Sequence, residues 1–294
     1  MSNPAQLLKE MKPEHDFFVG IDSDGCAFDS MEIKQKECFC PQFINHFDLQ
    51  PVSKYAREVW GFVNLYSTTR GCNRYLALVR ALDLLGERKE AADRNVRVPR
   101  LQGVREWIQG ETKLGLPALE EELSRNPDPD LRRAFDWSVE VNEVITKIVR
   151  NLPPFPYVRE SLEAIAAKAD SVVVSQTPLE ALEREWQEHD IDRYVRFIAG
   201  QELGTKAEHI TMAAGGKYRP ERVLMIGDAP GDLQAAQANN ALFFPINPGD
   251  EEESWRRFYD EGLDRFFNGT FAGKYEEALI KEFQAHLPEH PPWN

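Results

Sequence analysis

A small set of polar side chains lies at, or shortly after, the ends of short apolar runs in this 294-residue chain: Asp22, Asp24, Ser175, Lys206, Asp228 and Asp232. Carboxylate oxygens are the ligands that Mg²⁺ prefers, and a carboxylate can also act as a nucleophile or as a general acid and base. A lysine ammonium adds positive charge. These residue types suit a reaction in which a metal ion and a cation offset the negative charge of the substrate.

Their positions depend on five apolar runs, of which three are clear (17–21, 172–174 and 223–226) and two are weaker (195–199 and 241–246). Runs that are apolar at every position are typical of strands buried on both faces of a parallel sheet. Helical patterns separate the later runs, at 178–188, 206–214 and 232–239. The alternation predicts an α/β fold with a doubly wound parallel sheet.

The active sites of such sheets lie beyond the carboxyl ends of the strands. Asp22, Ser175 and Asp228 each follow one of the three clear runs. We therefore expect three residues that are far apart in the sequence to meet at one edge of the sheet.

The segment from 31 to 153 differs, because it holds helical patterns and no convincing strand. Helices are predicted near 52–65, 74–85 and 131–151, the last with Asp130 as its N-cap. We interpret 31–153 as an all-helical cap inserted into a core made of 1–30 and 154–294. The tail from Pro288 onward is expected to be irregular.

The composition excludes several classes of protein. A formal charge of −14 argues against nucleic acid or an anionic membrane as a partner. No apolar run approaches the roughly 20 residues of a membrane-spanning helix, and residues 1–14 lack the pattern of a secretory signal, so a cytoplasmic location is expected. The four cysteines give no disulfide framework and are expected to be reduced thiols. The sequence does not indicate an oligomeric state.

Four motifs together resemble those of the haloacid dehalogenase superfamily. The tetrapeptide Asp22-Ser23-Asp24-Gly25 resembles its first motif, Asp-x-Asp-Gly after a strand. Ser175, Lys206 and the hexapeptide from Gly227 to Asp232, a Gly-Asp-x-x-x-Asp pattern, follow in the order and spacing of that superfamily. The match covers the core, while the insertion matches only in its position and helical character.

The resemblance implies a role for each residue. Asp22 would be the nucleophile that carries an aspartyl-phosphate, and Asp24 the general acid and base. Asp22, Asp228 and the backbone carbonyl of Asp24 would bind Mg²⁺. Ser175 would bind a phosphoryl oxygen and Lys206 would supply positive charge, while Asp232 would orient Lys206 or metal-bound water.

An aspartate at position 24 resembles the phosphatase and phosphomutase branches of the superfamily. We therefore expect a phosphatase that acts on a small phosphomonoester. One alternative is a phosphotransferase or phosphomutase that uses the same aspartyl-phosphate, and another is a binding or regulatory protein without turnover. The sequence does not identify the substrate.

Other interpretations of single residues stay open. Thr177 is an alternative to Ser175, and Lys217 is an alternative to Lys206, although its shorter spacing to Asp228 fits less well. A calcium loop starting at Asp22 would need Glu at its twelfth position, which is Ile33. His209 is expected to be structural or solvated. Candidates for substrate binding are Arg70, Asn73, Arg74 and Gln176, although the two arginines suit surface or interhelical ion pairs equally well.

Overall fold

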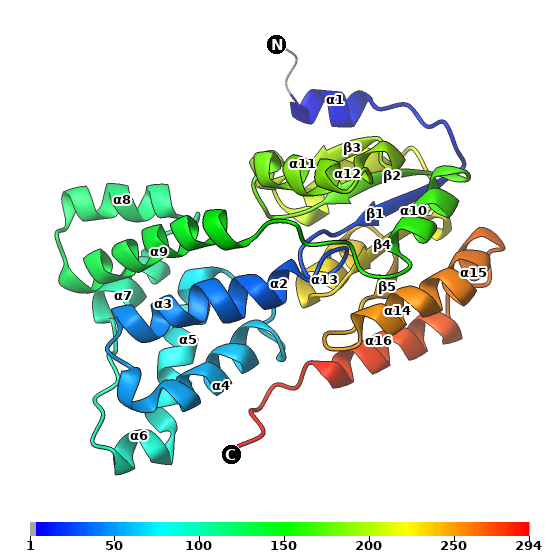
Figure 1. The fold of residues 1–294 in the computed structure, drawn as a ribbon. Helices are drawn as coiled ribbons and strands as arrows, with labels where there is room; N and C mark the ends of the chain where they lie inside the picture. Colours follow the sequence, from blue (N-terminus) through cyan, green and yellow to red (C-terminus); the bar gives the residue numbers. More distant parts are fainter. Residues whose placement is uncertain (1–3, 294) are drawn as a thin grey trace. The chain divides into compact units, whose positions relative to one another are not determined.

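The computed structural model describes residues 4–293, and the first of its two compact units, 4–31 and 151–287, is built around one five-stranded parallel sheet (Figure 1). The strands are β1 (Phe17–Ile21), β2 (Ala169–Val174), β3 (Phe197–Ala199), β4 (Val223–Gly227) and β5 (Leu242–Pro245). Their order is β3-β2-β1-β4-β5, and every neighbouring pair is parallel. The predicted doubly wound sheet is confirmed.

The second strand begins three residues before the predicted run, because its second and third residues, Asp170 and Ser171, are polar. Asp170 and Ser171 are buried in β2, and the Asp170 carboxylate accepts hydrogen bonds from Tyr218 Oη at 2.6 Å and from Glu14 N at 2.9 Å. Arg196 Nη1 also lies 2.6 Å from it. A fully satisfied charge can be buried, but it does not follow the apolar pattern from which the strand was predicted.

Helices cover both faces of the sheet. They are α1 (Pro4–Glu10), α10 (Val158–Ala166), α11 (Leu179–Glu188), α12 (Lys206–Ala214), α13 (Pro230–Ala238), α14 (Glu251–Arg257), α15 (Leu263–Phe267) and α16 (Lys274–His286). One face packs against α10, α14 and α15, and the other against α1, α12 and α13. Alternate strand residues therefore enter different apolar clusters: Val173 belongs to the first and Val172 to the second.

The sheet reverses its strand order between β1 and β4. The chain adds β2 and β3 on one side of β1, and then β4 and β5 on the other. Ligands bind open α/β sheets at the carboxyl ends of the strands beside such a reversal. Asp22 and Asp228 follow these two strands directly.

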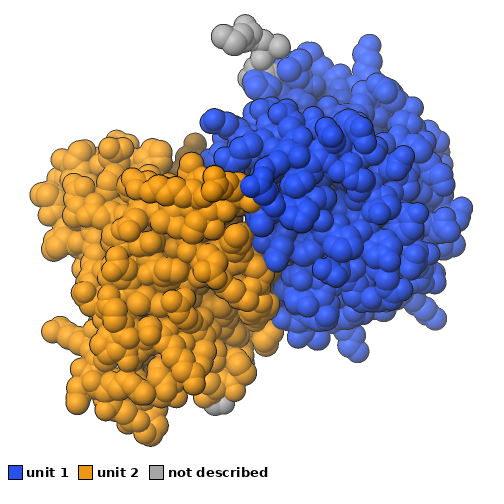
Figure 2. Space-filling model, viewed as in Figure 1, with its two compact units in different colours: residues 1–31, 151–287 blue, residues 32–150, 288–294 orange. Residues whose placement is uncertain are grey.

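A second, helical unit comprises 32–150 and 288–293 of the described residues (Figure 2). Its helices are α3 (Cys40–His46), α4 (Ser53–Asn64), α5 (Arg74–Glu87), α6 (Lys89–Asp93), α7 (Gln102–Gly110), α8 (Leu116–Arg125) and α9 (Pro129–Ile148), while α2 (Ser30–Ile33) crosses its first boundary. They pack around a cluster that includes Trp60, Tyr75 and Trp137. No strand occurs in this unit among the described residues.

The structure corrects one predicted helix cap. Asp128, not Asp130, caps α9, because its Oδ1 accepts hydrogen bonds from the backbone N–H groups of Asp130 at 2.8 Å and Leu131 at 3.0 Å. The helix begins at Pro129, where the missing N–H costs no hydrogen bond. The sequence interpretation placed the cap two residues later, at Asp130.

The C-terminal tail belongs to the helical unit, although the sequence interpretation assigned it to the core. Residues 288–293 have no helix or strand, as predicted. Thr68 N donates to Pro288 O at 3.4 Å, and the ring of Trp293 packs edge-on against Phe62, with 5.5 Å between centroids. The guanidinium of Arg88 lies 4.6 Å from the centroid of the Trp293 ring. No local sequence pattern predicts the contacts that anchor this segment.

None of the helices in the described part of the chain combines the length and the apolar character needed to cross a membrane.

Candidate active site

The loop after β1 carries Asp22 and turns back on itself. Asp22 N donates to Ile226 O at 2.9 Å, which ties the end of β1 to β4. Ala27 N donates to Ser23 O at 2.9 Å, and Gly25, with φ +77°, takes the left-handed conformation that favours glycine. The turn holds Asp22 at the sheet edge, where it is 3% exposed.

Lys206 lies between two of the carboxylates. Its Nζ is 2.8 Å from Asp22 Oδ2 and 2.6 Å from Asp232 Oδ1. It is the first residue of α12, which begins where Thr205 and Glu208 cap each other. The alternative lysine, Lys217, instead donates to two backbone carbonyls, those of Leu8 and Met212.

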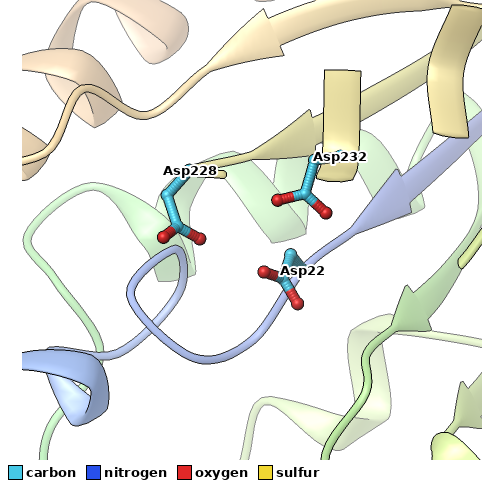
Figure 3. Close-up of side chains that lie close together, drawn as sticks. All are labelled: Asp22, Asp228 and Asp232. Carbon is cyan, nitrogen blue, oxygen red and sulfur yellow. The ribbon is translucent and has the colours of Figure 1, made fainter. Parts of the chain in front are cut away.

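Three carboxylates gather at this point, from Asp22, Asp228 and Asp232 (Figure 3). One oxygen from each lies within 4.8 Å of the others, and all three residues are buried. Burial raises the pKa of Asp22 well above its usual value; the charge of Lys206 opposes the shift, whereas Asp232 and Asp228 add to it. Burial lowers the Lys206 pKa, but the neighbouring carboxylates outweigh it and raise that pKa overall. Three carboxyl groups therefore surround one ammonium, a composition that suits a further cation.

The donor set of this cluster fits Mg²⁺. Asp22 Oδ1 is buried and has no hydrogen-bond partner among the described residues, and buried orphan acceptors are uncommon. Both oxygens of Asp232 are engaged, because Oδ1 contacts Lys206 and Oδ2 accepts a hydrogen bond from Ala229 N at 3.0 Å. Asp22 and Asp228 are therefore the better ligands, and Asp232 is placed to hold Lys206 while it caps α13.

Asp24 has its carboxylate held by two hydroxyl groups. Ser30 Oγ donates to Oδ1, and Thr177 Oγ1 donates to Oδ2 at 2.6 Å. The sequence interpretation had named Thr177 only as an alternative to Ser175, and had not named Ser30.

Ser175 follows β2, directly beside β1 in the sheet. Its backbone N–H donates to Ala199 O, and its hydroxyl accepts a hydrogen bond from Thr177 N at 3.2 Å. Gln176 turns toward the loop before α12, where its amide donates to Gly204 O at 2.8 Å.

The candidate substrate-binding residues of the helical unit are engaged in its packing. Asn73 caps α5 by accepting from Tyr75 N, and its amide donates to Leu114 O. Arg74 Nη1 donates to Ser138 and Asn142, and its guanidinium lies 5.0 Å from the centroid of the Phe39 ring.

Arg70, the remaining candidate in that unit, is buried and donates to Leu65 O at 2.9 Å. A direct role in substrate binding would require Arg70, Asn73 or Arg74 to release contacts that stabilise the unit.

Two tryptophans at the loop were not expected from the sequence. Trp186 Nε1 donates to Ser23 Oγ at 3.0 Å, and Trp255 Nε1 donates to Cys26 O at 2.7 Å. These residues are 163 and 229 positions away from their partners, so no local pattern could have indicated the contacts.

A comparison with known protein families finds a match to part of the chain. Residues 117–245 match the family model described as haloacid dehalogenase-like hydrolase. No curated protein matches the chain by sequence.

Several solved structures are similar to this chain. One is a presumed phosphoglycolate phosphatase from Lactobacillus delbrueckii subsp. bulgaricus, with 13% identity and a TM-score of 0.51, covering 88% of this chain and 100% of that one. Another is a haloacid dehalogenase-like family hydrolase from Xanthomonas campestris, with 13% identity, a TM-score of 0.43 and coverage of 87% and 99%. A third, a hydrolase of the same family from Streptococcus pneumoniae, has 12% identity, a TM-score of 0.44 and coverage of 81% and 90%. At such identities the likeness concerns the fold alone.

Proposed function

We propose that this chain, in which residues 117–245 match the haloacid dehalogenase-like hydrolase family model, hydrolyses a small phosphomonoester through a phosphoryl group carried on Asp22. Asp24 would serve as general acid and base. The helical unit would act as a cap that excludes bulk water from the site.

The contact of the Lys206 ammonium with both Asp22 and Asp232 is the observation that carries the proposal. An anionic nucleophile can approach an anionic phosphate only where positive charge lowers the repulsion and stabilises the transition state. Lys206 brings that charge to the nucleophile, and Asp232 fixes its position. A buried lysine surrounded by carboxylates has no comparable purpose in a purely structural core, where apolar packing is usually as stable.

The reaction then has two steps. An oxygen of Asp22 bonds to phosphorus while the bond from phosphorus to the ester oxygen breaks, and Asp24 gives its proton to that oxygen. Asp24 next takes a proton from water, which attacks phosphorus and frees Asp22 with release of phosphate. Ser175 would donate a hydrogen bond to a phosphoryl oxygen in both steps.

A Mg²⁺ ion bound by Asp22, Asp228 and the Asp24 carbonyl would supply positive charge to the phosphoryl oxygens. Asp24 must exchange at least one of its hydroxyl partners, Ser30 or Thr177, to reach the leaving oxygen.

The test is release of phosphate from a panel of phosphate esters with and without Mg²⁺. We expect Mg²⁺-dependent release that Asp22→Asn abolishes. Asp170→Asn is the matched control, because it also removes a buried carboxylate from the core but lies in β2 outside the site. It should lower the melting temperature and keep turnover per folded molecule.

Other results would redirect the proposal. Turnover that survives Asp22→Asn would exclude Asp22 as nucleophile. Transfer of the phosphoryl group to a second hydroxyl instead of water would indicate a phosphotransferase or mutase. Ligand binding without turnover across the panel would indicate a regulatory protein.

A further inference from the structure

Two buried indole groups hold the loop that carries Asp22 and Asp24. Trp186 of α11 and Trp255 of α14 are both 0% exposed, and each donates its N–H to the loop, to Ser23 Oγ and to Cys26 O. The loop is therefore held from two helices that are far apart in the sequence.

Ser23 is the centre of the turn. It lies between the two aspartates in the sequence, is fully buried, and its carbonyl accepts hydrogen bonds from Ala27 N at 2.9 Å and Phe28 N at 3.1 Å. Trp186 also packs edge-on against Phe28, with 6.0 Å between ring centroids. One indole thus contacts both ends of the turn.

Burial of a tryptophan does not by itself produce such a bond in this protein. Trp107 and Trp137 are also buried, and their Nε1 atoms have no hydrogen-bond partner among the described residues. Trp60 is buried as well, and its Nε1 donates to Gln35 Oε1 at 2.9 Å, so such bonds also occur outside the loop. The N–H bonds of Trp186 and Trp255 each satisfy a donor that would otherwise be costly to bury.

We propose that Trp186 and Trp255 are positioning residues that hold the loop so that Asp24 is aligned with Asp22 for proton transfer. The inference rests on the proposed function, because it takes Asp24 as the acid that protonates the leaving oxygen while the bond to phosphorus breaks. A displacement of about 1 Å at a catalytic group can cost on the order of 100-fold in rate. We call this pair of indole groups, Trp186 and Trp255, the clamp. The clamp therefore acts on the proton-transfer step more than on substrate binding.

Leaving groups of different basicity separate this role from a merely structural one. A p-nitrophenolate leaving group departs with little help from an acid, whereas an alkoxide needs the proton of Asp24. In Trp186→Phe and Trp255→Phe, we expect kcat for an alkyl phosphate to fall at least tenfold more than kcat for p-nitrophenyl phosphate, with KM nearly unchanged. Trp137→Phe is the matched control, since it removes an unpartnered indole N–H, and it should affect both substrates equally. Equal losses on both substrates in the clamp variants would overturn the proposal.

A double-mutant cycle tests the Trp186 to Ser23 bond directly. Ser23→Ala should reproduce the loss seen in Trp186→Phe, and the double variant should lose no more than either single variant. Independent losses that multiply in the double variant would contradict a shared bond.

Hydrogen exchange of the peptide that contains residues 22–28 gives a readout without turnover. We expect faster exchange of the Ala27 and Phe28 amides in Trp186→Phe and Ser23→Ala than in the wild type. Absence of turnover in the wild-type protein would count against the proposed function alone. Unchanged exchange in both variants would overturn the clamp whatever the activity.

Discussion

Replacing Lys206 by Met tests the charge balance of the carboxylate cluster. The ammonium lies 2.8 Å from Asp22 and 2.6 Å from Asp232, and its side chain is largely buried. Removing one partner of a buried ion pair costs about 3–5 kcal/mol, because the remaining charge stays buried and uncompensated. We expect Lys206→Met to lose about that much unfolding free energy at pH 8 without Mg²⁺.

The loss should shrink at lower pH. Without Lys206, burial and carboxylate repulsion raise the pKa of Asp22 further, so the folded variant binds a proton more tightly than the unfolded chain. A group whose folded pKa is raised contributes stability at low pH and loses it as the pH rises through that pKa. The difference between wild type and Lys206→Met should therefore be smaller at pH 5.5 than at pH 8.

Urea unfolding at the two pH values measures this effect, with Lys217→Met as the matched control. Lys217 Nζ donates to the carbonyls of Leu8 and Met212 and, within 4–293, to no carboxylate, so its loss should cost about 1–3 kcal/mol at either pH. A pH-independent loss in Lys206→Met that is no larger than the control would refute the buried ion pair. Turnover of the Lys206 variant should also fall by about 100- to 1000-fold.

Three further predictions concern the supporting residues. Burial, and then the charge of Lys206, lower the His209 pKa to about 4, so the neutral ring is the native form. In urea titrations, the unfolding free energy of the wild type should fall between pH 6.5 and 4 by up to about 3 kcal/mol more than that of His209→Leu. An equal fall in both proteins would show that His209 does not cause this pH dependence. A Cβ at Gly227 would lie 2.4 Å from the Cβ and Cγ of Asp232, so Gly227→Ala should displace that carboxylate and reduce kcat at least tenfold in the phosphate-release assay. A kcat for Gly227→Ala equal to that of the wild type would show that the position of Asp232 need not be fixed. Trp293→Ala removes the contacts with Phe62 and Arg88 and should lower the unfolding free energy of the helical unit by about 1–3 kcal/mol; a loss below about 0.5 kcal/mol would show that the tail is not anchored.

The elements that hold the predicted site residues could be read from the sequence because their signals are local. The runs at 17–21 and 223–226 became β1 and β4, since strands buried on both faces need apolar residues at every position. The helix beginning at Lys206 was predicted with its observed bounds, and its start coincides with the reciprocal cap of Thr205 and Glu208.

Contacts between distant residues could not be predicted in the same way. Thr177 reaches Asp24 across 153 positions, and only the pairing of β2 with β1 brings them together. The charge of Asp170 inside β2 depends on donors from three separate segments, so its strand looked shorter in the sequence than it is. Local patterns indicate which segments form strands and helices, whereas packing decides which polar groups meet.

The anchoring of the tail has a practical consequence for dissecting the protein. The helical unit is built from two separate segments of the chain, 32–150 and 288–293 of the described residues. Trp293 of the second segment packs against Phe62 and Arg88 of the first. A recombinant fragment of 32–150 would expose to solvent the surface of Phe62 and Arg88 that Trp293 covers. Adding 288–293, as a fused segment or a separate peptide, should restore it, so this unit is a candidate for fragment complementation.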